Sequence, residues 1–106
     1  MSNVPEISVQ EAAAAWRNGA VLLDVREPAE LAVCCVEPCL HIPMREIPGR
    51  LAEIPADRPV LVLCHVGARS ARVTQFLLGQ GRSNVANVAG GIEAWACEID
   101  PSLARY

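Results

Sequence analysis

The chain has 106 residues, a length typical of one domain, and its 52% apolar content is sufficient for a hydrophobic core. The formal net charge is −3 and no basic cluster occurs, which argues against nucleic acid or an acidic membrane surface as a partner. All nine basic residues are arginines, so a Schiff-base lysine and a P-loop lysine are excluded.

The first predicted element is a helix that begins after Ser8. Ser8 and Glu11 have the spacing of a capping box, and Gly19 can supply the left-handed conformation that ends a helix. Trp16 shares one face of this helix with smaller apolar residues and is expected to pack against the core.

Short strands and helices alternate along the rest of the chain. The expected strands cover residues 20–25, 39–43, 59–64 and 84–91. The expected helices cover residues 29–34, 70–78 and 91–99, and a helical turn or two is expected within residues 48–55. This alternation indicates a small α/β domain with a mostly parallel sheet. The strand that ends at Cys64 is short and apolar throughout, so we expect it at the centre of the sheet with both faces covered.

The five cysteines do not form the pattern of a disulfide framework. Their number is odd, Cys34 and Cys35 are adjacent, and no signal peptide precedes them, so a reducing cytoplasm is the expected compartment. The longest apolar runs are far shorter than a membrane span. Cys39 and His41 could add metal ligands to the adjacent pair, but no Cys-x2-Cys pair occurs, and we expect no metal.

Cys64 stands at a position where a thiol can become reactive. The segment CHVGARS follows the strand, and its backbone N–H groups can curl around the sulfur if Gly67 adopts a positive φ. A helix that starts near Ser70 would direct its unpaired amides to the same point, and the Ser70 hydroxyl could cap that helix or donate to the sulfur. Arg69 would add a positive charge that draws an anionic substrate. The simpler alternative is that Cys64 only fills the core.

Four motifs, LLDVREPAEL, HIP, CHVGARS and NVAGGIEAW, occur in the order and spacing of a single-domain rhodanese. The chain resembles this family from about Ile7 to Tyr106. The resemblance implies a rhodanese-like three-layer fold in which helices flank a five-stranded, mostly parallel sheet. Residues 1–106 would then form one domain, with a core over residues 7–100.

The resemblance also implies a sulfurtransferase. Cys64 would take a sulfane sulfur from thiosulfate or a similar donor as a persulfide, and would pass it to cyanide, a thiol or a protein. Small sulfur donors and acceptors, and a sulfur-accepting protein, are the expected partners of a monomer or weak dimer that needs no cofactor. The residues expected to bind substrate are those of the loop, His65, Val66, Gly67, Ala68, Arg69 and Ser70.

Two alternatives use the same residues differently. Cysteine phosphatases and arsenate reductases hold an oxyanion with Cys-x5-Arg, whereas four residues separate Cys64 from Arg69 here, and this smaller ring suits one sulfur atom better. A rhodanese module used only for docking or regulation usually lacks the loop cysteine, which this chain retains.

Several side chains near the expected site have open roles. Asp24 and Arg26 are possible supporting residues, either as an ion pair that braces the next loop or, for Arg26, as a contact of an anionic donor. His65 is expected to tune the choice of donor at the rim rather than to act as a general base, and His41 to be structural.

Where the family usually has Gly-His, this chain has CCVEPCLHIP. Its three cysteines are expected to be apolar fillers, with a resolving partner for Cys64 as the alternative. Cys97 is expected to pack in the core.

Overall fold

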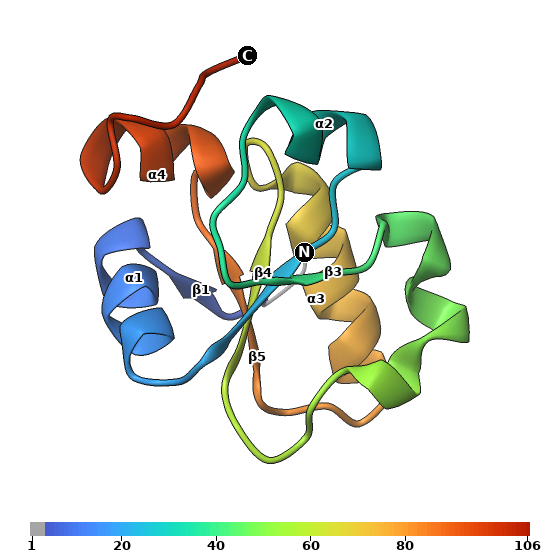
Figure 1. The fold of residues 1–106 in the computed structure, drawn as a ribbon. Coiled ribbons are helices and arrows are strands. Elements are labelled where there is room, and N and C mark those ends of the chain that lie inside the picture. Colours follow the sequence, from blue (N-terminus) through green and yellow to red (C-terminus); the bar gives the residue numbers. More distant parts are fainter. Residues whose placement is uncertain (1–3) are drawn as a thin grey trace.

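The structure, a computed structural model, describes residues 4–106. Its strands are β1 (Glu6–Ile7), β2 (Val21–Asp24), β3 (Leu40–His41), β4 (Val60–Leu63) and β5 (Val85–Val88). Its α-helices are α1 (Val9–Arg17), α2 (Pro28–Val33), α3 (Ala68–Gly79) and α4 (Gly91–Glu98), and two 3-10 helices, η1 (Met44–Gly49) and η2 (Leu51–Glu53), connect β3 to β4. Figure 1 shows these elements along the chain.

The five strands form one parallel sheet in the order β1-β5-β4-β2-β3. The expected central position of β4 is therefore confirmed, and so is the α/β class. The edge strand β1 was not expected from its residues, because it is two residues long in a polar segment. The first helix begins as predicted, since the Ser8 hydroxyl accepts a hydrogen bond from the Glu11 amide. The Glu11 carboxylate accepts from the Ser8 hydroxyl, which leaves the capping box half formed.

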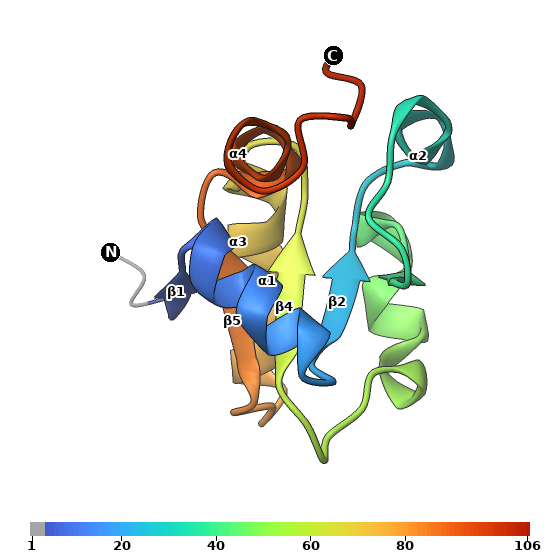
Figure 2. The same cartoon turned by 60° about the vertical axis from the view of Figure 1, so that its left-hand side comes forward.

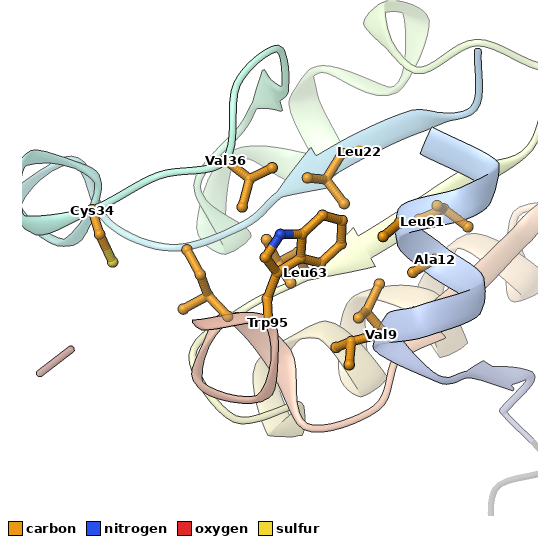
Figure 3. Close-up of a cluster of buried hydrophobic side chains, with 11 residues drawn as sticks. Val9, Ala12, Leu22, Cys34, Val36, Leu61, Leu63 and Trp95 are labelled. Atoms are coloured by element: carbon orange, nitrogen blue, oxygen red, sulfur yellow. The ribbon is translucent and has the colours of Figure 1, made fainter. Parts of the chain in front are cut away.

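Alternate residues of β4 enter two hydrophobic clusters, one on each face of the sheet. Leu61 and Leu63 pack with α1 and α4, whereas Val60 and Val62 pack with α3 and the 3-10 helices. In the first cluster, the Trp95 indole lies among Leu22, Leu61 and Leu63 (Figure 3). Helices on both faces explain why β4 is apolar at every position.

The loop after β4 lies at the same end of the molecule as α2, α4 and the C-terminal segment (Figures 1 and 2). This is the edge at which the parallel strands have their carboxyl ends, where ligands of such sheets gather. Within residues 4–106, no helix is long and apolar enough to span a lipid bilayer.

Candidate active site

Cys64 follows directly after the central strand, and its thiol lies inside the loop that leads to α3. The residue is 1% exposed and belongs to the cluster between the sheet and α3. Its Sγ nevertheless has two hydrogen-bond donors, the Gly67 amide at 3.1 Å and the Ser70 hydroxyl at 3.1 Å. A core cysteine needs no such donors, whereas a thiolate is stabilised by them.

The geometry of this loop depends on Gly67, which has a φ of 110°. An added Cβ would also lie 3.4 Å from the backbone nitrogen of Gly90. Because Gly67 turns the chain so sharply, α3 begins at Ala68, two residues earlier than expected. Ser70 is therefore inside the first turn of α3, and its hydroxyl contacts the sulfur instead of capping the helix.

The N-terminus of α4 holds the loop from the other side. The amides of Ile92 and Glu93 donate to the carbonyl oxygens of Cys64 (2.9 Å) and His65 (3.0 Å). Gly91 makes this contact possible, because an added Cβ would lie 2.6 Å from the Cys64 oxygen and still closer to that of His65. These bonds tie both carbonyl groups to α4, while the Gly67 amide binds the sulfur. The contact explains why residue 91 is a glycine.

Asn87 of β5 is a buried polar neighbour of the loop that the sequence did not single out. Its Nδ2 donates to the Gly67 oxygen at 3.3 Å and to the Glu6 carboxylate at 3.0 Å. Its Oδ1 is buried without a hydrogen-bond partner among residues 4–106. Asn87 thus links the edge strand β1 to the Cys64 loop.

Asp24 and Arg26 form an ion pair of 2.8 Å in which both side chains are fully buried. Arg26 also donates to the carbonyl oxygen of Cys34 at 2.9 Å, and its own carbonyl contacts the His41 ring. These contacts occupy the Arg26 guanidinium within the protein. The His41 Nε2 lies 2.7 Å from the Arg26 carbonyl oxygen.

Arg69 and Glu30 form a two-pronged ion pair, with nitrogen–oxygen distances of 2.7 and 2.8 Å. The hydrogen bonds from Arg69, opposed by partial burial, lower the pKa of the Glu30 carboxyl to about 2. The charge of Arg69, which was expected to draw an anionic substrate, is therefore paired with that of Glu30. No local signal predicted this pair, because 39 positions separate the partners.

The other loop residues form the outer rim. Val66 is 58% exposed, Ala68 is exposed, and the His65 ring stacks on that of Tyr106, with centroids 4.0 Å apart and planes 11° apart. A shallow depression of about 530 Å³ lies on this outer side. It is lined by His65, Val66, Glu93, Arg105 and Tyr106. Of the six residues expected to bind substrate, Gly67 and Ser70 are the ones that donate hydrogen bonds to the sulfur.

All five cysteines are free, so none of the other four forms a disulfide with Cys64 in this structure. Cys34 and Cys39 pack with the cluster on the opposite face of the sheet, where Figure 3 shows Cys34 at the edge. Burial and nearby Asp24 raise the pKa of Cys39 to about 11, and burial also raises that of Cys35. The expectation that Cys97 packs in the core is wrong, because it is exposed on α4. Among residues 4–106, no cluster of three or more metal-ligating side chains occurs.

Comparisons with known proteins give sequence and structural relatives of this chain. A sequence model of the rhodanese-like domain matches residues 8–98. A sulfurtransferase of Allochromatium vinosum is 46% identical over 84 residues, which cover 79% of this chain and 78% of that protein. The thiosulfate sulfurtransferase GlpE of Pseudomonas entomophila is 34% identical, with 90% of this chain and 87% of that protein covered.

A solved structure shows the same fold within a larger protein. The crystal structure of reduced CoADR-RHD from Bacillus anthracis matches with a TM-score of 0.87 and 31% identity. The match covers 97% of this chain, which spans only 18% of that longer one.

Proposed function

The chain belongs to the rhodanese-like domain family, and we propose that it is a sulfurtransferase in which Cys64 carries the transferred sulfur. The observation that supports this role most directly is the pair of donors at Sγ, the Gly67 amide and the Ser70 hydroxyl, each at 3.1 Å. A thiolate is the nucleophilic form of cysteine, and two donors at one sulfur favour that form.

In the first half-reaction, the Cys64 thiolate attacks the outer sulfur of thiosulfate. A bond forms between the two sulfur atoms, the sulfur–sulfur bond of thiosulfate breaks, and sulfite leaves with its electron pair. Cys64 then carries a persulfide whose terminal sulfur is negatively charged. Donors fixed in the loop stabilise such a charge without reorganisation.

In the second half-reaction, a thiophilic acceptor attacks the terminal sulfur of the persulfide. Cyanide would bind this sulfur and leave as thiocyanate. The electrons of the broken sulfur–sulfur bond would return to Cys64 as its thiolate. Thiosulfate is the donor that we favour, because it stands in the name of the GlpE relative that matches 90% of this chain. The two half-reactions share one covalent intermediate, which gives ping-pong kinetics.

Phosphoryl or arsenate chemistry is a less suitable function for this loop. An oxyanion site needs a free arginine at the ring, whereas Arg69 is bound to Glu30 through both of its terminal nitrogens. A docking module would not need a thiol with two hydrogen-bond donors.

We further propose that residues 1–106 act as one domain with its core at residues 7–100, which the match over residues 8–98 supports. The five free thiols fit a reducing compartment such as the cytoplasm.

Steady-state formation of thiocyanate from thiosulfate and cyanide tests this proposal. We expect parallel double-reciprocal lines for the wild type and a loss of at least about a thousandfold for Cys64→Ser. Cys97→Ser is the matched control, because Cys97 is exposed and lies outside the loop. A Cys64→Ser protein that keeps wild-type turnover, or a wild type that hydrolyses aryl phosphates and forms no thiocyanate, would refute the proposal.

A further inference from the structure

Tyr106 connects the Cys64 loop to the opposite wall of the site. Its hydroxyl donates to the Glu30 carboxylate at 2.7 Å and accepts from the Arg26 guanidinium at 2.9 Å, while its ring stacks on His65. These partners belong to three separate segments, α2, the turn before it and the loop after β4. In Figure 2, the C-terminal segment lies between α4 and α2, above the end of β4.

A second contact fixes the same segment on the other side of the loop. Arg105 forms an ion pair with Glu93, a residue whose amide binds the His65 carbonyl oxygen. The segment is thus attached to α2, to α4 and to the loop itself. Burial raises the pKa of the Tyr106 hydroxyl, which keeps it protonated as the donor to Glu30.

With these contacts in place, the Cys64 sulfur is almost inaccessible to solvent. Cys64 is 1% exposed, and the depression on the outer side of the loop is lined by His65 and Tyr106 but does not include Cys64. A reagent that reaches Sγ must therefore pass between side chains that cover it, or displace one of them. Tyr106 is 43% exposed and held by two hydrogen bonds and one stacking contact, so it can move without opening the core.

We infer that Tyr106 is a specificity-determining residue, which in its bound position admits small sulfur donors and acceptors to Cys64 and delays bulky ones. The choice of sulfur compounds as substrates rests on the proposed function, but the control of access does not. Small ions such as thiosulfate and cyanide would react while Tyr106 stays bound. A peptide thiol would react only from the fraction of molecules in which Tyr106 has left Glu30 and His65.

Alkylation of Cys64 by a small and a bulky reagent measures this selectivity without sulfur transfer. The two reagents are iodoacetamide and fluorescein maleimide, and mass spectrometry of peptides reports the rate at Cys64, with exposed Cys97 as an internal reference. In Tyr106→Ala, we expect the maleimide rate at Cys64 to rise roughly tenfold, because hydrogen bonds to two charged groups are lost. The iodoacetamide rate should change by less than about twofold.

Two further variants identify the cause. Tyr106→Phe keeps the stacking on His65 and loses both hydrogen bonds. Its ratio of maleimide to iodoacetamide rates should therefore lie between that of the wild type and that of Tyr106→Ala. Ala104→Ser, a change at an exposed position of the same segment, should leave the ratio unchanged. An unchanged ratio in Tyr106→Ala, or an equal rise of both rates, would overturn the inference. A raised ratio in a protein that forms no persulfide would uphold it and refute the proposed chemistry instead.

Discussion

At the scale of single residues, the Ser70 hydroxyl provides one of the two hydrogen bonds to the Cys64 sulfur. It is fully buried and donates to Cys64 Sγ at 3.1 Å. Ser70→Ala removes one of two donors, and a hydrogen bond to a charged group typically contributes enough for a change of about tenfold. We expect iodoacetamide to modify Cys64 roughly tenfold more slowly at neutral pH in this variant.

Thr74→Val is the matched control for Ser70→Ala. Thr74 is also fully buried on α3, but its hydroxyl donates to the Ser70 backbone oxygen, not to the sulfur. Its loss should leave the alkylation rate of Cys64 near that of the wild type. If Ser70→Ala reacts as fast as Thr74→Val, the hydroxyl does not stabilise the thiolate.

The ion pair between Glu30 and Arg69 predicts a dependence of stability on pH. The pKa of Glu30 is about 2 in the folded protein and 4.5 without its partners. Since the folded pKa is the lower one, the pair stabilises the fold fully above the unfolded value. That contribution is lost as the pH falls through 4.5 toward 2.

Chemical denaturation across this acid range tests the assignment. Glu30→Gln should be less stable than the wild type at neutral pH, and should lose less further stability as the pH falls. Asp57→Asn, which removes a carboxylate whose side chain is 80% exposed, should follow the wild-type curve. Parallel acid curves for the wild type and Glu30→Gln would show that another group causes the loss.

At the scale of elements, the close contact of α4 with the Cys64 loop depends on Gly91. Its φ is +60°, and an added Cβ would lie 2.6 Å from the Cys64 oxygen. Gly91→Ala must therefore push α4 from the loop and adopt a disfavoured conformation, which we expect to lower the free energy of unfolding by about 2–4 kcal/mol. Cys64 should also react more slowly with iodoacetamide, because the loop loses its support.

Gly79→Ala provides the comparison for this change. Gly79 is the last residue of α3, and an added Cβ there meets nothing within 4 Å. Alanine favours a helix more than glycine does, so this variant should be as stable as the wild type or slightly more stable. Equal stability of Gly91→Ala and Gly79→Ala, in urea titrations, would contradict the close contact.

The elements that the sequence predicted are those whose signals are local. The run at residues 60–63 indicated β4 because both faces of that strand are covered, and Ser8 and Gly19 marked the ends of α1. The start of α3 was placed two residues late, because the positive φ of Gly67 lets the helix begin directly after the turn. Strand β1 was missed because a two-residue edge strand carries no periodicity.

At the scale of the whole molecule, the site is assembled from segments that are far apart in the chain. The sequence predicted Cys64, Gly67 and Ser70 because their motif is continuous. The pairing of Arg69 with Glu30 and the contact of Tyr106 with Arg26 span 39 and 80 positions, so only the fold reveals them. Cys97 was misplaced for a similar reason, since its side of α4 is decided by packing against the sheet.

The most direct test of the account is the mass of the intact protein after incubation with thiosulfate and removal of excess donor. We expect a gain of about 32 Da, the mass of one sulfur atom, that peptide mapping assigns to Cys64 and that cyanide removes. Cys97→Ser should gain the same mass, and Cys64→Ser should gain none. A wild-type protein without the added sulfur, or an equal adduct on Cys64→Ser, would contradict the assignment of Cys64 as the sulfur carrier.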